Sequence, residues 1–208
     1  MKELNDQVQE ILVNLDRQGI KKIIAFSGGA DESLENKVLE VTEQSMHEFK
    51  QYPIAILTGG TKWGLPKYAS ELAKKNRIPL IGVYPARGKK YSFDQLDYAV
   101  EVEPRYGISE WGDESEIFAK LVNGVEVIGG GFGTLIEFAH LMKSNERKIK
   151  DKVDPVYVAP VRFPEMNSAA DVAYTFCRKP ELAVCFPNKE IIANGEEAAK
   201  FLIEKLKL

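Results

Sequence analysis

The sequence predicts an α/β fold, with a mostly parallel sheet that carries helices on both faces. Short apolar runs alternate with longer segments of helical spacing along the whole chain, a pattern typical of parallel strands joined by helices. Three of the runs lead directly into a glycine pair and then a helix. In a parallel sheet these three loops meet at the carboxyl edge, where open α/β sheets bind ligands.

The composition is that of an ordinary globular domain. A chain of 208 residues suits one domain covering 1–208. The net charge of −3 provides no general basic surface, so no nucleic-acid partner is expected. The start of the chain lacks a signal-peptide core, and no apolar run has membrane-spanning length. We therefore expect a cytoplasmic protein with no membrane partner.

The cysteines and histidines indicate no metal centre. Cys177 and Cys185 do not form a CxxC pair, and His47 and His140 lie far apart in the sequence. The sequence therefore predicts no metal site and no cofactor. Two buried or half-buried thiols in a reducing compartment are expected instead.

The helices are predicted from apolar residues that recur at intervals of three and four. Gly19 ends the first helix, and Asp31 is a candidate N-cap for the second. The predicted helices cover 3–18, 32–50, 65–75, 114–121, a central helix from 134, and a last helix from 195.

The strands are predicted from short apolar runs rich in β-branched residues. Between them, 84–113 is largely irregular, 143–152 is a polar connection, and 160–180 is a loop or short helix. A long connection in a compact domain is usually functional or mobile. The predicted strands cover 21–26, 54–57, 79–83, 98–102, 125–128, 156–159 and 182–186.

The stretch 125–138 has the most informative pattern, a buried strand followed by a glycine turn and a helix start. Glycines let the backbone approach a ligand closely, and the helix start directs unpaired N–H groups and a positive dipole end into the loop. That arrangement favours an anion. Similar loops follow the strands at 22–26 and 54–57. The candidate phosphate-binding residues are Ser27, Gly28, Gly29, Gly59, Gly60, Thr61, Lys62, Gly130, Gly131, Phe132, Gly133 and Thr134.

These loops do not match the common nucleotide fingerprints. The P-loop pattern is absent, and Thr134 stands where GxGxxG requires its last glycine. Each loop taken alone has an alternative interpretation as a tight turn that needs glycine. Lys62 is a phosphate partner or a solvated lysine. Trp63 stacks on a base or packs against the helix that follows it.

The segment from Gly130 to Glu137 resembles the signature PGGxGTxxE of the Lonely-guy (LOG) family and the wider SLOG superfamily. Residues 58–65 resemble the other glycine loop of that superfamily, in a form closer to the TRPM-like branch. The resemblance covers roughly residues 20–145. It implies a Rossmann-like sheet that binds nucleotides or their derivatives, in a protein that forms dimers or larger homo-oligomers.

The resemblance leaves three functions open. A TRPM-like protein binds ligands such as ADP-ribose without cutting them, as a sensor or carrier. LOG enzymes are phosphoribohydrolases that cleave the N-glycosidic bond of nucleoside 5′-monophosphates. Carriers of molybdenum cofactor also belong near this superfamily. We favour a binder of an adenine-type nucleotide, with the hydrolase and the molybdenum cofactor carrier as alternatives.

Two departures from the LOG pattern favour binding over hydrolysis. Gly129 replaces the signature proline, and Glu114 falls where LOG enzymes carry an arginine. A carboxylate cannot replace a guanidinium that holds phosphate, and Asp113 and Glu116 make the segment more acidic. Arg105 is the nearest arginine and would have to reach in from the irregular segment.

Glu137 has two compatible interpretations. As a catalytic residue, it would hydrogen-bond the ribose or stabilise an oxocarbenium-like transition state. As a structural residue, it would close a capping box with Thr134.

Overall fold

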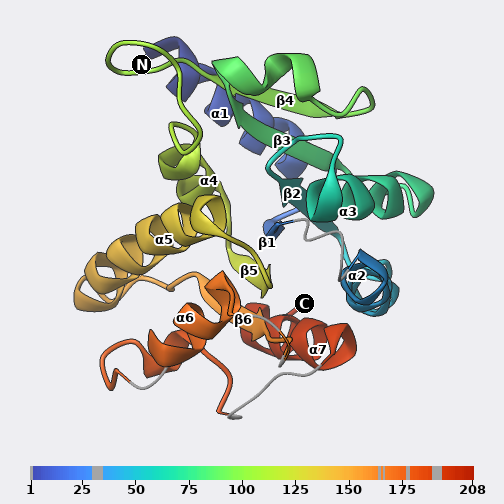
Figure 1. Cartoon of the computed structure of the whole chain (residues 1–208), viewed down its shortest axis with the longest axis vertical. Helices are drawn as coiled ribbons and strands as arrows, with labels where there is room; N and C mark the ends of the chain where they lie inside the picture. Colours follow the sequence, from blue (N-terminus) through green and yellow to red (C-terminus); the bar gives the residue numbers. More distant parts are fainter. Residues whose placement is uncertain (1, 30–34, 164, 166, 177–178, 189–193) are drawn as a thin grey trace.

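The sheet is parallel throughout. The computed structural model describes residues 2–29, 35–163, 165, 167–176, 179–188 and 194–208. Its six strands lie in the order β4-β3-β2-β1-β5-β6, and all neighbouring strands pair in parallel (Figure 1). The strands are β1 (Lys22–Gly28), β2 (Ile54–Thr58), β3 (Leu80–Pro85), β4 (Tyr98–Val102), β5 (Gly124–Ile128) and β6 (Tyr157–Val161). The predicted α/β, Rossmann-like class is confirmed.

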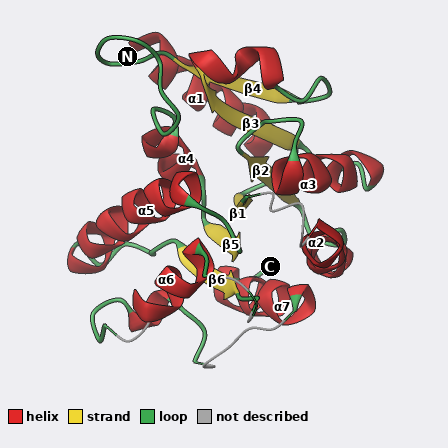
Figure 2. Cartoon of the chain, in the orientation of Figure 1, coloured by secondary structure: helices red, strands yellow, loops and turns green. Residues whose placement is uncertain are grey.

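Helices cover both faces of this sheet (Figure 2). The core on one face includes side chains from α1, α4, α5 and α6, and the core on the other face includes side chains from α2, α3 and α7. The helices are α1 (Lys2–Arg17), α2 (Glu35–Phe49), α3 (Gly64–Lys75), α4 (Ser115–Leu121), α5 (Phe132–Lys150), α6 (Ala169–Phe176) and α7 (Gly195–Leu206), with short 3₁₀ turns η2 (Ala86–Tyr91) and η3 (Ala183–Cys185).

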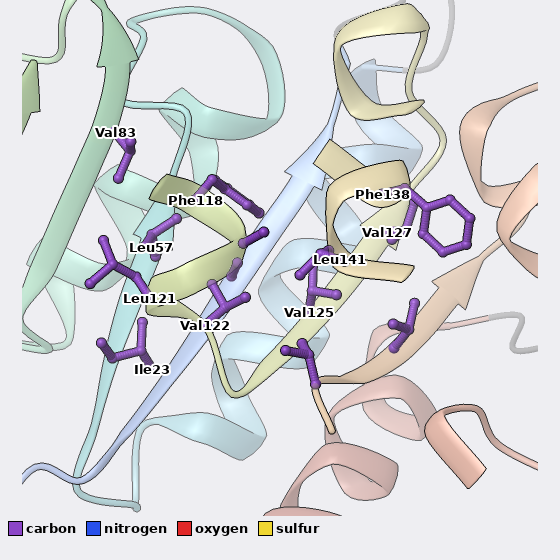
Figure 3. Close-up of a cluster of buried hydrophobic side chains, with 14 of the residues drawn as sticks. Ile23, Leu57, Val83, Phe118, Leu121, Val122, Val125, Val127, Phe138 and Leu141 are labelled. Atoms are coloured by element: carbon purple, nitrogen blue, oxygen red, sulfur yellow. The ribbon is translucent and has the colours of Figure 1, made fainter. Parts of the chain in front are cut away.

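Successive strand residues supply the two cores in turn. Ile23 and Ala25 of β1 belong to the first core, and Ile24 and Phe26 belong to the second, as the two-residue period of a strand requires. In Figure 3, side chains of the strands meet Phe118 and neighbouring residues of α4 on the first face. Strands buried on both faces explain why the sequence shows continuous apolar runs.

The strand order places a topological switch at β1. From β1 the chain adds β2, β3 and β4 on one side, and it then returns to add β5 and β6 on the other. The crossovers on either side of β1 therefore run in opposite directions, and this opens a crevice at the carboxyl ends of β1 and β5. The fold thus brings the first and last of the predicted glycine loops together.

The predicted strand at 182–186 is wrong. This segment forms the turn η3, with the amide of Cys185 donating to the carbonyl of Leu182 at 2.9 Å. Leu182 and Cys185 are buried, whereas Val184 between them is 51% exposed. Burial with a spacing of three fits a 3₁₀ turn. An entirely apolar run does not reveal that spacing in the sequence.

The predicted polar connection at 143–152 is also wrong, because α5 continues to Lys150. Asn145 is fully buried within this part of the helix, and its side-chain amide bonds the backbone N–H and C=O of Val156, each at 2.8 Å. The charged residues around it are good helix formers. The predicted N-cap Asp31 lies outside the described residues, whereas the predicted strand at 98–102 is confirmed as β4.

A buried glutamate interrupts the core at the centre of β5. Glu126 is inaccessible to solvent, and its Oε2 lies 2.6 Å from Ser45 Oγ of α2. The same hydroxyl lies 3.1 Å from the carbonyl oxygens of Val41 and Gly195. One hydroxyl hydrogen cannot serve three acceptors, so the geometry fits a protonated Glu126 that donates to Ser45 Oγ, and Glu126 Oε1 has no partner among the described residues. Burial raises the pKa of Glu126 to about 8.

The pKa of Glu126 predicts a contribution to stability that falls as the pH rises from about 4.5 to about 8. A folded-state pKa above the unfolded value gives stability that is complete below the unfolded pKa and is lost as the pH rises through about 8. Over that interval the free energy of unfolding should fall by at most about 1.4 kcal/mol per pH unit for this group. Glu126→Gln keeps a neutral side chain and should flatten the profile, as measured by urea denaturation across pH.

Glu43→Gln provides the control, because Glu43 is an exposed glutamate of α2. This variant should retain the wild-type profile. If the Glu126→Gln profile were as steep as that of wild type, Glu126 would be ionised in the folded protein.

Candidate functional site

The carboxyl ends of β1 and β5 lie against each other. Gly28 pairs with Ile128 in the ladder, and a Cβ atom on Gly28 would lie only 2.3 Å from the Ile128 carbonyl oxygen. One residue later, a Cβ on Gly29 would lie 3.4 Å from the Gly130 Cα. The sequence therefore folds two of its three glycine loops into one contiguous surface.

The loop after β5 turns the chain into α5. Gly130 has φ +89°, and a Cβ there would lie 2.5 Å from Thr134 Oγ1, so both conformation and space require glycine. Gly131 is the N-cap of α5 and has no side-chain cap. The amide of Leu135 donates to the Gly131 carbonyl at 3.0 Å, which is the first bond of the helix.

The amino end of α5 offers unpaired donors. Within the described part of the chain, no group accepts a hydrogen bond from the backbone N–H of Phe132, Gly133 or Thr134. Gly131, Phe132 and Gly133 are exposed. Three unpaired N–H groups and the positive end of the helix dipole form an anion-binding arrangement.

Contacts with α6 orient this loop. The carbonyls of Gly130 and Gly129 accept hydrogen bonds from the amides of Ala169 and Ala170, at 2.9 and 3.0 Å. The N–H and C=O of one peptide unit point in opposite directions. The N–H groups of Gly130 and Gly131 therefore point away from α6, and the negative ends of these two peptides are already paired.

A pocket of about 410 Å³ lies between this loop and α6. Phe132 and Leu135 line one side, and α6 with the residues just before it lines the other. Asp171 accepts from the backbone and hydroxyl of Ser168, each at 2.9 Å, and pairs with Arg162 at 2.5 Å. The pocket is lined by Gly130, Gly131, Phe132, Leu135, Asn167, Ser168, Ala169, Asp171, Val172 and Thr175.

The loop after β2 lies at the same sheet edge, but most of its backbone is already bonded. The amide of Gly60 donates to Thr58 Oγ1 at 3.1 Å, and its carbonyl accepts from Phe93 at 2.7 Å. The amide of Lys62 donates to the Tyr91 carbonyl at 2.9 Å, and Thr61 bridges to Ser92. Among the residues that the structure describes, none forms such a bond with Gly59.

The side chains of the β2 loop differ in what they offer. That of Lys62 is exposed, and no carboxylate in the described ranges pairs with it. The ring of Trp63 packs on Tyr91, with centroids 4.5 Å apart. Lys62 is therefore the cation that this loop can supply to a ligand.

Glu137 does not form the capping box. Helix α5 begins at Phe132, so Thr134 lies inside the first turn and Gly131 is the N-cap. The carboxyl of Glu137 instead accepts a hydrogen bond from Ser27 Oγ at the end of β1. Burial of this carboxyl raises the pKa of Glu137 to about 8, against the lowering effect of the Ser27 bond, and Glu114 raises it further. At neutral pH this pKa favours the protonated form of the Glu137 carboxyl.

The segment before α4 places an acid, not an arginine, near Glu137. Glu114 is buried and accepts from the amide of Gly112 at 2.9 Å, and burial raises its pKa. Arg105 pairs with Glu116, which also pairs with Lys120 at 2.7 Å. Arg105 therefore pairs with Glu116 and not with a group of the crevice.

Residues 21–154 match the family model described as the SLOG cluster4 family. The chain belongs to the SLOG cluster4 family. The match covers the glycine loops that follow β1, β2 and β5, together with Glu137. Membership of the SLOG superfamily, expected from the residues 130–137, is confirmed. The more specific TRPM-like branch stays a prediction.

Solved structures of related fold include molybdenum cofactor proteins. The molybdenum cofactor carrier protein of Chlamydomonas reinhardtii is 21% identical, with a TM-score of 0.65 over 90% of this chain and 99% of that one. The molybdenum cofactor binding protein of Rippkaea orientalis is also 21% identical, with a TM-score of 0.59 over 90% and 98%. No curated protein sequence matches the chain. At this identity the likeness shows the fold.

Other parts of the sequence interpretation have mixed outcomes. Cys185 is buried as expected, and burial raises its pKa to about 11, whereas Cys177 lies outside the described residues. No helix in the described ranges is long and apolar enough to cross a bilayer. Homo-oligomerisation and cytoplasmic location stay predictions. The sequence predicts a loop or short helix over 160–180; the structure forms α6 there, and its role as a pocket wall was not predicted.

Glu114→Gln should lower the pKa of Glu137. The carboxylate of Glu114 is one of the groups that raise this pKa, and a neutral amide removes the like charge. A ¹³C NMR titration of the glutamate carboxyl carbons measures the shift. Glu116→Gln changes a carboxyl paired with Arg105 and Lys120 and should leave the pKa of Glu137 in place. An unchanged pKa of Glu137 in Glu114→Gln would show that Glu114 does not influence the ionisation of Glu137.

Two glycine variants should differ in stability. A Cβ on Gly60 would lie 2.7 Å from the Tyr84 ring and 3.1 Å from the Gly82 Cα, with φ at +67°. Gly60→Val should therefore lower the free energy of unfolding by about 2 kcal/mol or more. A Cβ on Gly131 meets nothing within 4 Å, so Gly131→Val should cost no more than about 1 kcal/mol. Chemical denaturation that ranks the pair the other way would contradict this packing.

Proposed function

We propose that this SLOG protein binds a phosphate-bearing nucleotide or nucleotide-derived cofactor, as a carrier or sensor, with the phosphate at the amino end of α5. The observation that carries the proposal is the set of unpaired N–H groups of Phe132, Gly133 and Thr134. Lys62 adds a positive side chain from the β2 loop. Ser27 and Glu137 supply hydroxyl and carboxyl groups to the ribose or its equivalent.

The adjoining pocket suits the non-phosphate part of such a ligand. Its volume of about 410 Å³ lies within the range of small-molecule sites. Phe132 and Leu135 offer apolar surface, and Ser168 and Asp171 offer polar groups at one end. A planar heterocycle fits this combination. ADP-ribose and adenine nucleotides are the ligands proposed first.

The molybdenum cofactor is a second candidate ligand, favoured by the two similar structures that bind or carry it. Its pterin carries a phosphate, which the amino end of α5 would hold in the same way. The pterin would occupy the pocket beside Phe132. The residues of this chain would bind and orient the cofactor and shield it from water.

Hydrolysis of nucleoside monophosphates, the LOG-type reaction, is expected to be slow or absent. It requires negative charge to be stabilised on the leaving base while the phosphate is held still. The family arginine position is taken by Glu114, and Arg105 is paired with Glu116. Loss of one preorganised electrostatic contact typically reduces the rate by about 10²–10³. A neutral Glu137 also stabilises an oxocarbenium ion less than a carboxylate does.

Calorimetric titration with adenosine 5′-monophosphate and with ADP-ribose tests the binding. Gly131→Val should abolish binding while costing no more than about 1 kcal/mol of stability, because its side chain stands in front of the helix N–H groups. Lys62→Ala should weaken binding more at low salt than at high salt. Lys75→Ala, at an exposed position at the far end of α3, should have no effect. Equal affinity of wild type and Gly131→Val would show that the loop is only a structural turn and does not bind the nucleotide.

Chromatography of the same mixtures tests the chemistry. We expect no free base above the background of a protein-free control. Release of base at enzyme-like rates that is lost in Glu137→Ala would reject the carrier or sensor function and establish the hydrolase.

A further inference from the structure

A second pocket, of about 590 Å³, lies at the same sheet edge on the β3 side. Turn η2 follows β3 directly, and β1 and β2 separate β3 from the strand that precedes α5. None of the residues of the glycine loops lines it. The pocket is lined by Ala86, Arg87, Lys89, Lys90, Tyr91 and Trp111.

The cations of this pocket are available to an anion. Arg87 pairs with Glu110, and Lys89 pairs with Glu101 at 2.7 Å, but Arg87, Lys89 and Glu110 are all substantially exposed. Such surface pairs contribute little to stability, so a phosphate can replace the carboxylates. Within the described part of the chain, Lys90 has no carboxylate at ion-pair distance, and its Nζ lies 4.7 Å from the centroid of its neighbour Tyr91.

The aromatic rings give the pocket an apolar surface. Trp111 is 44% exposed, and its ring edge approaches Gly88 so closely that a Cβ there would lie 3.3 Å from it. The guanidinium of Arg87 lies 6.0 Å from the Trp111 ring centroid. The backbone of Arg87 also holds this segment, since its amide donates to Ser109 Oγ at 3.1 Å. A fixed, half-exposed indole beside three cations is therefore a preformed feature of the fold.

We propose that this pocket is a second binding site, which takes an aromatic phosphate of the nucleoside monophosphate class. The base stacks on Trp111, and the phosphate is held by Lys89, Lys90 and Arg87. An indole offers a large, rigid stacking surface, and a guanidinium with two ammonium groups matches the charge of a phosphate. Occupancy of this site does not require the site at α5.

The two sites share structural supports. The bridge between Thr61 and Ser92 ties the β2 glycine loop to the end of η2. Gly112, next to Trp111, lies against Ile136 of α5, where a Cβ would be 3.2 Å from the Ile136 side chain. A ligand in the second pocket thus contacts segments that also frame the first crevice, and a protein that senses nucleotides could respond through them.

Tryptophan fluorescence isolates the second pocket, because Trp63 and Trp111 are the only two tryptophans of the chain. Trp63→Phe retains a ring against Tyr91 and leaves Trp111 as the single reporter. We expect adenosine 5′-monophosphate to change the Trp111 emission saturably in this variant. Ribose 5-phosphate, which lacks the base, should bind at least about tenfold more weakly. Equal binding of the two compounds would overturn the stacking on Trp111.

Charge variants in the Trp63→Phe background test the phosphate contacts. Lys89→Ala combined with Lys90→Ala should raise Kd at least about tenfold, and Arg87→Ala serves as a second variant if the first fails to fold. The matched control combines Lys143→Ala with Lys148→Ala. Both lysines belong to α5, which does not line this pocket, so Kd should be unchanged.

Gly131→Val in the same background separates this proposal from the function proposed for the α5 site. The Trp111 signal should persist with unchanged Kd, even if calorimetry shows that the α5 site is lost. A signal that disappears in Gly131→Val but survives the lysine replacements would overturn the second site. The absence of any saturable signal at millimolar nucleotide would overturn it as well.

Discussion

The close approach of β1 and β5 at their carboxyl ends is the constraint on which the rest of the site depends. Where Gly28 passes Ile128, a Cβ atom would meet the Ile128 carbonyl at 2.3 Å and Leu65 of α3 at 2.5 Å. The absence of a side chain therefore lets β1, β5 and α3 meet. Without that contact, the loop of β1 would not lie beside the loop that starts α5, and Ser27 would not reach Glu137.

The electrostatics of the crevice agree with this geometry. An anion site in a protein of net charge −3 must be local, and backbone N–H groups at a helix start provide local positive potential. Acids nearby would oppose it if they were charged. Burial raises the pKa of Glu137 to about 8 and also raises that of Glu114. The shift at Glu137 favours a neutral acid beside the phosphate position, so Glu137 repels a phosphate less than the acidic sequence implies.

The sequence predicts the fold well because strand and helix periods, together with glycine turns, are local signals. Each of the six observed strands overlaps a predicted run, and parallel pairing then determines which loops share an edge. The strand at 182–186 failed because a uniformly apolar run has no readable period. The helix through 143–150 was missed because its one buried polar residue, Asn145, is stabilised by Val156, a contact that only the tertiary structure creates.

The sequence predicts which loops form the site, but it does not predict which hydrogen-bond donors in those loops are free to bind a ligand. The motif residues identify the amino end of α5, but the sequence does not show that Gly60 and Lys62 have already bonded their amides to Thr58 and Tyr91. Nor does it show that Glu137 turns to Ser27 instead of capping its own helix. Each of the two pockets is completed by a segment whose structure the sequence leaves undecided, 160–180 for one and 84–113 for the other, so tertiary contacts alone reveal them.

The central claim is that the first N–H groups of α5 bind phosphate, and NMR tests it at those atoms. In ¹H–¹⁵N spectra of the assigned protein, titration with inorganic phosphate should shift the amides of Phe132, Gly133 and Thr134 downfield and saturably, since a charge-assisted hydrogen bond forms at each. The amides of Gly60 and Lys62, which are already bonded, should move less. Saturable shifts confined to other parts of the chain, with the α5 amides unmoved, would contradict the account.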